Sequence, residues 1–192
     1  MSVWRRLSGW LMTLAGAAMI AALVHIVAIL IIPLYATRDA FARLSELGAV
    51  HQTILLPQAA PQQRLIPYGD PAVASAFCRF DLADGPVRVK APTDPSGFVS
   101  LSFHTRRGAI FYALTDKAAT HGALEALVVT EDQLRALQAK DDEDTPVQDL
   151  RILSTTKAGF VLMRSLSEEP SLYPRAEGAV KSLSCASEAA PS

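Results

Sequence analysis

The chain has 192 residues, of which 18 are Lys or Arg and 19 are Asp or Glu, giving a formal net charge of −1. Nucleic-acid-binding domains carry basic stripes or patches, and this balanced composition excludes that class, so we expect no nucleic-acid partner. Outside an apolar N-terminal segment about 150 residues remain, which is enough for one domain with its own hydrophobic core.

The first predicted element is this apolar segment. No charged residue lies between Leu7 and Thr37, and residues 11–34 are almost wholly apolar. Because about 20 apolar residues cross a hydrocarbon layer of about 30 Å, the segment predicts a transmembrane helix over residues 11–34, with the lipid bilayer as its partner. A signal peptide has a shorter apolar stretch, followed by small residues at its cleavage site. The favoured interpretation is an uncleaved anchor over residues 1–37, and a cleaved signal is the alternative.

The orientation of this helix depends on the basic residues beside it. Arg5 and Arg6 precede the helix, and Arg38 and Arg43 follow it, so the two counts nearly tie. Since Arg5 and Arg6 are closer to the membrane edge, we expect a cytoplasmic N-terminus, in the inner membrane of the cell, and a periplasmic C-terminal domain. His25, near the middle of the helix, either bonds within its own helix or contacts another helix of an assembly.

Residues 38–70 are predicted to connect the anchor to the folded domain. Residues 38–47 have a helical pattern, and Gly48 follows at the position of a helix C-cap. A short extended segment over residues 53–56 and a loop rich in Pro and Gln come next. We therefore expect a helical stalk and a linker, then a β-rich domain over residues 71–185 and a disordered tail over residues 186–192.

From Val73 on, apolar and polar residues alternate with a period of two, which predicts strands. They cover residues 73–82, 87–90, 98–105, 109–115, 124–130, 150–156 and 160–166. Residues 105–108 and 156–159 each end in a glycine that suits the left-handed position of a hairpin loop, so each predicts a hairpin between its neighbouring strands. Short connections between strands predict an α+β fold with mainly antiparallel pairing.

Two helices are predicted in the second half of the domain. Thr130 and Gln133 form the pattern of a capping box, which predicts a helix start at this point. The last helix is predicted over residues 172–183, with Ser171 as its cap.

The chain has two cysteines, Cys78 and Cys185, and no Cys-x-x-Cys pair. This spacing excludes the common zinc and redox motifs, and we expect no metal site. Cys78 shares a predicted strand face with Ala76 and Phe80 and should point into the core. A disulfide to Cys185, at the end of the last helical pattern, would tie the C-terminal helix to a core strand across a separation of 107 residues. Closing a loop near that size contributes on the order of 4–5 kcal/mol in the chain-entropy treatment. The alternative is a pair of unpaired thiols that act as small buried hydrophobes.

Three runs of sequence carry a family resemblance, namely residues 78–89, 98–108 and 112–119. They resemble domain of unknown function 1254, in particular its short membrane-anchored alphaproteobacterial type, and the similarity extends from the anchor to the last helix. The resemblance implies a β-rich domain and a protein carrying domain of unknown function 1214 as a partner. It implies no reaction, and no catalytic residue is transferred.

Few residues of the sequence are candidates for a catalytic or binding role. His104, Asp116 and His121 are the candidate catalytic residues, as an acid–base cluster formed by a strand and the loop after the next strand. Loop Asp and Thr residues also satisfy turn backbone, which is the competing interpretation. Lys117, next to Asp116, is a candidate for a polar binding site, because the family resemblance includes this position. Arg106 and Arg107 are candidates for binding an anionic partner, and exposed turns also use arginine for solubility.

No catalytic motif, phosphate-binding loop or paired zinc histidines occur in the sequence, and we expect no cofactor. The favoured hypothesis is an envelope protein that binds another protein or an envelope component. The alternative is a hydrolase-like enzyme with a site around Asp116, His104 and His121.

Overall fold

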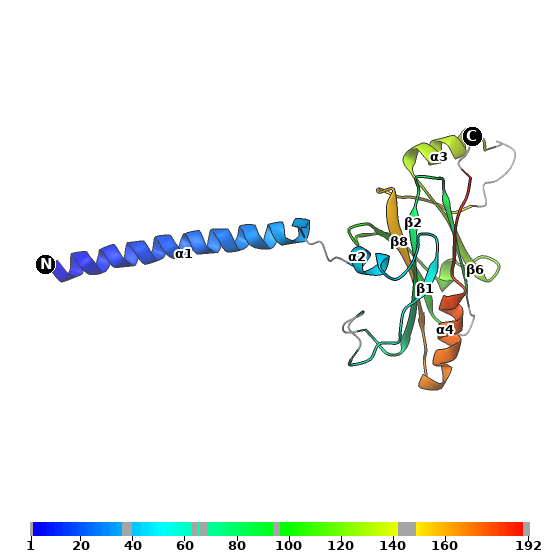
Figure 1. Ribbon diagram of the computed structural model, residues 1–192, viewed down its shortest axis with the longest axis horizontal. Helices are drawn as coiled ribbons and strands as arrows, with labels where there is room; N and C mark the ends of the chain where they lie inside the picture. The colour runs from blue at the N-terminus through cyan, green and yellow to red at the C-terminus, as the bar shows by residue number, and fades with distance from the viewer. Residues whose placement is uncertain are drawn as a thin grey trace. The chain divides into compact units, whose positions relative to one another are not determined.

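The computed structural model describes residues 2–35, 40–62, 65, 69–93, 97–141 and 149–189, with the side chains of the first helix from Ser8 to Ile32. The chain divides into two compact units, residues 1–38 and residues 39–192. Residues 38–39, 63–64 and 66–68 of the predicted stalk and linker, and residues 190–192 of the predicted tail, lie outside the described residues (Figure 1).

The first unit is the helix α1, Ser2–Tyr35. Its segment Ser8–Ile32 has 25 residues and is apolar and long enough to cross a membrane. At 1.5 Å per residue this segment is about 38 Å long, which exceeds the roughly 30 Å of a hydrocarbon core. Its side chains lie outside any protein core. Both a retained anchor and a signal sequence have these properties.

The second unit contains two sheets that share one hydrophobic core. The five-stranded sheet has the order β1-β2-β8-β4-β5, and the four-stranded sheet has the order β7-β6-β3-β9. The strands are β1 Thr53–Leu55, β2 Val73–Asp81, β3 Val87–Pro92, β4 Val99–Thr105, β5 Ile110–Thr115, β6 Ala123–Val129, β7 Arg151–Leu153, β8 Ala158–Leu166 and β9 Ser184–Ser187. The α+β fold with mainly antiparallel strands is therefore confirmed.

The alternation of apolar residues explains which strand faces form the core. Leu101 and Phe103 of β4, Val87 and Val89 of β3, and Val161 of β8 are fully buried in one cluster. Burying this much apolar area on both sheets is the main stabilising contribution of such a domain. The predicted strands of residues 73–82, 98–105 and 109–115 match β2, β4 and β5 within one or two residues.

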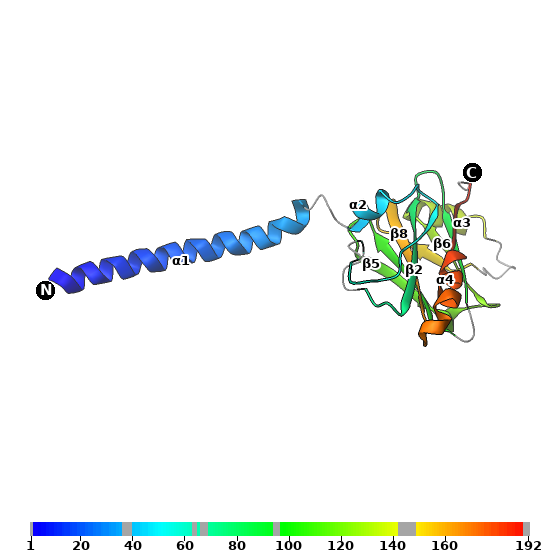
Figure 2. The ribbon, with the colours of Figure 1, turned by 60° about the horizontal axis from the view of Figure 1, so that its bottom comes forward.

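Within the described part of the domain, three helices and two short 3₁₀ turns accompany the sheets. These are α2 Ala40–Ser45, α3 Glu131–Gln138, α4 Tyr173–Lys181, Asp116–Ala118 and Pro170–Leu172. The predicted capping box is confirmed, because the Thr130 hydroxyl accepts from the Gln133 amide and the Gln133 side chain accepts from the Thr130 amide. The helix α4 packs on β2, and its buried residues Ala176 and Val180 belong to the same core cluster as Ala74 and Ala76 of β2 (Figures 1 and 2).

One of the two predicted hairpins is wrong. The turn at residues 105–108 joins β4 to β5, with Gly108 at a φ of 82°. Residues 156–159, in contrast, join strands of different sheets, because β7 pairs with β6 in parallel and β8 pairs with β2 and β4. Gly159 lies inside β8, where an added Cβ would lie 2.3 Å from the carbonyl oxygen of His104. It is a glycine because of this close approach, not because of a turn.

The C-terminal segment also differs from the prediction. The last helix begins at Tyr173 with Leu172 as its N-cap residue, not Ser171, and ends at Lys181. Cys185 lies in the strand β9, which pairs with β3 and continues to Ser187. Residues 186 and 187, predicted as part of a disordered tail, therefore belong to a sheet. At the other end, β1 pairs with β2, so part of the predicted linker also belongs to the domain.

Candidate functional site

An aromatic and basic cluster lies between α2 and the outer face of the five-stranded sheet. The Phe41 ring of α2 lies 6.4 Å from the Phe160 ring of β8, measured between centroids. The guanidinium groups of Arg79 and Arg106 lie 5.8 and 5.6 Å from the centre of the Phe41 ring. These distances allow cation–π attraction, so Phe41 holds α2 against β8, β2 and the β4–β5 hairpin.

Arg79 also fixes the chain that follows α2. Its Nη2 atom donates a hydrogen bond of 2.5 Å to the carbonyl oxygen of Gly48, and its backbone carbonyl accepts from the amide of His51 at 2.8 Å. Its buried Nε atom has no hydrogen-bond partner among the described residues. One strand residue thus binds the segment between α2 and β1 at two points.

His104 extends this cluster along the sheet. Its ring stacks on Phe160 with centroids 4.5 Å apart and an interplanar angle of 6°. Nδ1 lies 3.2 Å from the Gly108 carbonyl oxygen, and Nε2 lies 2.9 Å from the Ser102 hydroxyl oxygen. Because a carbonyl oxygen only accepts, Nδ1 carries the proton, and Nε2 of the neutral ring is an acceptor for the Ser102 hydroxyl. The Leu162 carbonyl oxygen, 3.3 Å from the Ser102 oxygen, is a second acceptor that competes for the same hydroxyl proton.

The protonation of His104 follows from its surroundings. Burial lowers the pKa of His104 below its usual value of 6.5, and Arg164 lowers it further, while the hydrogen bond to Gly108 acts in the opposite direction. The neutral imidazole therefore predominates at pH 7. A serine hydroxyl donating to a neutral histidine nitrogen is the contact by which a general base activates a nucleophile. Here a backbone carbonyl occupies the position where a catalytic triad has a carboxylate.

The other predicted catalytic residues lie apart from His104. In the antiparallel β4–β5 ladder His104 pairs with Ile110, whereas the opposite end pairs Ser100 with Thr115, next to Asp116. Asp116 begins a 3₁₀ turn, where its carbonyl oxygen accepts from the Ala119 amide. His121 lies in the following turn with a φ of 53°. The structure therefore does not bring the three predicted residues together.

The binding candidates are divided between the two ends of β5. Arg106 and Arg107 lie at the tip of the β4–β5 hairpin, and Lys117 lies in the 3₁₀ turn at the far end. All three side chains are exposed. The described residues contain no group of three or more His, Cys, Asp or Glu side chains that could hold a metal ion.

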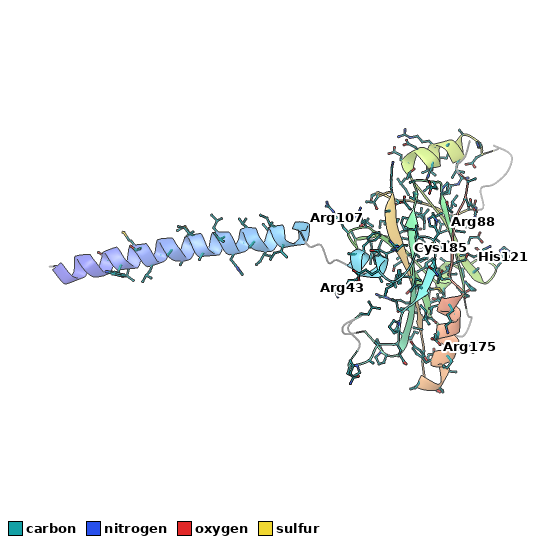
Figure 3. The ribbon with its side chains drawn as sticks, in the orientation of Figure 1. Arg43, Arg88, Arg107, His121, Arg175 and Cys185 are labelled. Atoms are coloured by element: carbon teal, nitrogen blue, oxygen red, sulfur yellow. A yellow bond between two sulfur atoms is a disulfide. The ribbon has the colours of Figure 1, made fainter. Side chains whose placement is uncertain are left out.

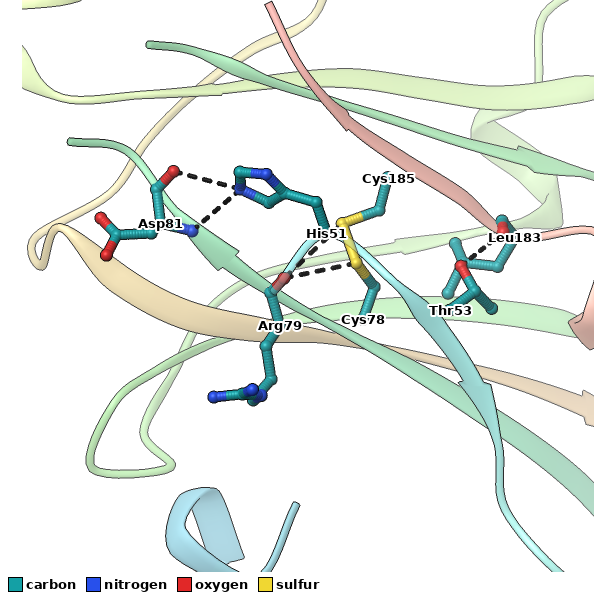
Figure 4. The surroundings of a disulfide bond; sticks show 7 residues. All are labelled: His51, Thr53, Cys78, Arg79, Asp81, Leu183 and Cys185. Carbon is teal, nitrogen blue, oxygen red and sulfur yellow. Dashed lines mark hydrogen bonds between the residues drawn. A yellow bond between two sulfur atoms is a disulfide. The ribbon is translucent and has the colours of Figure 1, made fainter. Parts of the chain in front are cut away.

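Cys78 and Cys185 are joined in a disulfide, which connects β2 of one sheet to β9 of the other (Figure 4). Two hydrogen bonds near the disulfide connect the segment of His51 and Thr53 to the chain before β9 and to β2. The Thr53 hydroxyl donates to the Leu183 carbonyl oxygen at 2.7 Å, and the Asp81 amide lies 3.2 Å from Nε2 of His51. His51 and Thr53 therefore join the chain before β2 to the region of the disulfide.

The comparisons with known proteins identify the domain. The family model described as "Protein of unknown function (DUF1254)" matches residues 50–187. The chain belongs to the DUF1254 family. No curated protein matches it significantly.

Two solved structures resemble parts of this DUF1254 chain. The VPA0106 protein from Vibrio parahaemolyticus is 11% identical with a TM-score of 0.49, over 63% of this chain and 29% of that protein. A putative uncharacterized protein from Burkholderia cenocepacia is 14% identical with a TM-score of 0.41, over 69% of this chain and 37% of that protein. This chain therefore corresponds to about a third of the length of either protein.

An ion-pair network lies on the other sheet of the DUF1254 domain. Arg88 of β3 pairs with Glu125 of β6 at 3.0 Å, with Asp149 before β7 at 2.8 Å, and with Glu188 after β9. Hydrogen bonds to Asp149 and Glu188 raise the pKa of the Arg88 guanidinium, and Arg88 lowers the pKa of Asp149. The sequence did not reveal this network, because the four residues come from separate segments and the period of two over residues 87–90 predicts only a strand.

Proposed function

We propose that this chain is a single-pass inner-membrane protein of the short, membrane-anchored DUF1254 type. Residues 11–34 span the bilayer, the N-terminus is cytoplasmic, and the β-rich domain lies in the periplasm. Support for the anchor comes from the 25-residue, predominantly apolar segment Ser8–Ile32 of α1. This length exceeds the 7–15 apolar residues of a signal peptide, which favours retention of the helix.

The disulfide is the observation that supports the side of the membrane. Disulfides persist in oxidising compartments such as the periplasm and are rare in the cytoplasm, where thiols are kept reduced. Cys78 and Cys185 are both buried and connect the two sheets of the domain. A domain held together in this way is suited to the periplasmic side.

Reporter fusions test this placement. Alkaline phosphatase joined to the C-terminus should be active, and a green fluorescent protein at the same position should be dark, because each reporter matures on only one side of the membrane. The chain should remain in the membrane pellet after alkaline extraction. A fluorescent C-terminal fusion or release from the pellet would refute the proposal.

We further propose that the domain acts by binding another envelope protein, and a DUF1214-containing protein is the first candidate. Support comes from β5, an edge strand of the five-stranded sheet on which Ile110 is 63% exposed and Tyr112 is 39% exposed. An exposed edge strand offers backbone groups for pairing with an extended segment of a partner.

A substitution on this edge tests the binding proposal. Ile110→Lys should reduce co-purification of the partner after cross-linking in cells, because lysine on an edge strand opposes strand addition. Leu153→Lys is the matched control, since Leu153 is 47% exposed on β7, an edge strand of the other sheet. Equal recovery of the partner with both variants would exclude β5 as the binding edge.

The enzyme alternative is supported by one contact, the 2.9 Å distance between the Ser102 hydroxyl and Nε2 of His104. In this proposal Ser102 is the nucleophile and His104 the general base, while Asp116 and His121 have no part in the same site. A fluorophosphonate probe should then label Ser102, and His104→Gln should abolish labelling. A wild-type chain that stays unlabelled would exclude this alternative.

A further inference from the structure

Besides the half-buried Arg79, three exposed arginines among the described residues lie on α2 or at the tip of the hairpin beside it. Arg43 lies on α2 itself, and Arg106 and Arg107 form the tip of the β4–β5 hairpin. All three are exposed, and neither Arg43 nor Arg107 forms an ion pair with a described residue. We call these three residues the arginine patch.

The patch is held together by the packing of Phe41. The Arg106 guanidinium lies 5.6 Å from the centre of the Phe41 ring, which places the hairpin tip beside α2. Figure 3 shows Arg43 and Arg107 at the side of the domain where α2 lies. Among the described residues around α2, Glu46 is the exposed acidic residue, so the local charge of this described surface is positive.

The position of α2 in the sequence indicates that the arginine patch lies near the membrane. Residues 36–39 alone separate the end of α1 from the start of α2. A chain extends by at most about 3.6 Å per residue, so a bilayer that holds α1 cannot be far from α2, whatever the orientation of the domain. Juxtamembrane arginines are attracted to the negative surface of membranes that contain anionic lipids.

We propose that the arginine patch binds anionic phospholipid headgroups of the membrane that holds α1. The inference rests on the proposed anchoring and adds a second contact between domain and membrane. Arg43 and Arg107 supply the free guanidinium groups, which pair with phosphate oxygens in a bidentate manner. The contact of Arg106 with Phe41 connects this binding to the docking of α2 on β8.

Hydrogen exchange of the full chain in lipid nanodiscs tests the proposal. One disc contains phosphatidylcholine alone, and the other contains phosphatidylcholine with phosphatidylglycerol at a ratio of seven to three. Peptides covering residues 40–47 and 104–110 should exchange more slowly in the anionic disc. Because the Debye length falls to about 3 Å at 1 M salt, high salt should remove this difference.

Single variants assign the effect to the patch. Each basic residue near an anionic surface contributes about fivefold to the ratio of docked to undocked domain, so Arg43→Gln and Arg107→Gln should each lower it by about that factor. The matched control is Lys117→Gln, since Lys117 is exposed and lies at the far end of β5. It should leave the exchange difference unchanged, and the thermal midpoints of all three variants should equal that of the wild type.

Three outcomes would overturn the inference. They are equal exchange in both discs, an effect of Lys117→Gln equal to that of Arg107→Gln, and protection that appears only when an acidic protein is added. If the chain stays in the disc in these cases, the anchoring proposal survives. A chain that washes out of both discs refutes the anchoring proposal itself and the inference with it.

Discussion

Removing the disulfide should destabilise the domain strongly, because the bond closes a long loop between the two sheets. Cys78 and Cys185 are 107 residues apart in the sequence. In the chain-entropy treatment a loop near this length contributes about 4.7 kcal/mol to stability at 25 °C. Small domains unfold with a total of about 5–15 kcal/mol, so this loss is a large share. For a domain of about 150 residues it corresponds to a decrease of roughly 10–20 °C in the melting temperature.

Thermal unfolding of the detergent-solubilised full chain, followed by circular dichroism, measures this effect. The double variant Cys78→Ala/Cys185→Ala should melt roughly 10–20 °C below the wild type. A reducing agent should lower the melting temperature of the wild type toward that of the variant and leave the variant itself unchanged. If reduction changes neither the melting temperature nor the electrophoretic mobility of the wild type, the disulfide is absent and the reasoning fails.

Three other substitutions or titrations test separate parts of the structure. Gly159→Ala should cost about 1–3 kcal/mol in urea unfolding, since its Cβ would meet the His104 carbonyl oxygen at 2.3 Å, whereas Gly178→Ala in α4, with open space around it, should gain about 0.5–1 kcal/mol; equal effects would contradict the close approach. Arg88 lowers the pKa of Asp149 in the folded state, so this carboxylate stabilises the fold above its unfolded pKa of about 3.9 and loses that effect as the pH falls through the folded value. Arg88→Gln should therefore weaken the acid-dependent loss of stability near and below pH 4, and an identical pH profile would refute the network. Because burial lowers the pKa of His104, its NMR titration should have a midpoint below 6.5 and stability should decrease as the pH falls from about 7 toward that midpoint; a midpoint at or above 6.5 would contradict the buried, neutral ring.

The sequence predicted the elements whose signal is local. Alternation of apolar residues located β2, β4 and β5, and the side-chain pattern of Thr130 and Gln133 located the start of α3. Pairing between strands depends on residues far apart in the sequence, and the prediction of the second hairpin failed for this reason. Residues 156–159 resemble a hairpin turn, but β7 and β8 join different sheets, which only long-range packing decides. The strand β9 was missed because four residues of small and polar type give no periodic signal.

The contacts of the candidate site also depend on long-range packing that local sequence patterns do not predict. His104 was selected from the sequence, but its contact with Phe160 joins residues far apart in the chain and depends on the register of β4 and β8. The register of β4 and β5 separates His104 from Asp116, although the sequence predicted a cluster between this strand and the loop after the next one. The role of Phe41 was also hidden, because its helical stripe predicted only a stalk and not a docking contact on the sheet.

Protease treatment of spheroplasts tests the placement of the domain most directly. In a chain tagged at its N-terminus, added protease should remove the domain and leave a membrane-embedded fragment that keeps the tag and α1, because we place residues 11–34 in the bilayer and the disulfide-linked domain outside the cytoplasm. The mass of the untreated, membrane-extracted protein should include the apolar helix. An intact chain that resists protease until the spheroplasts are lysed, or a soluble product without α1, would contradict this account.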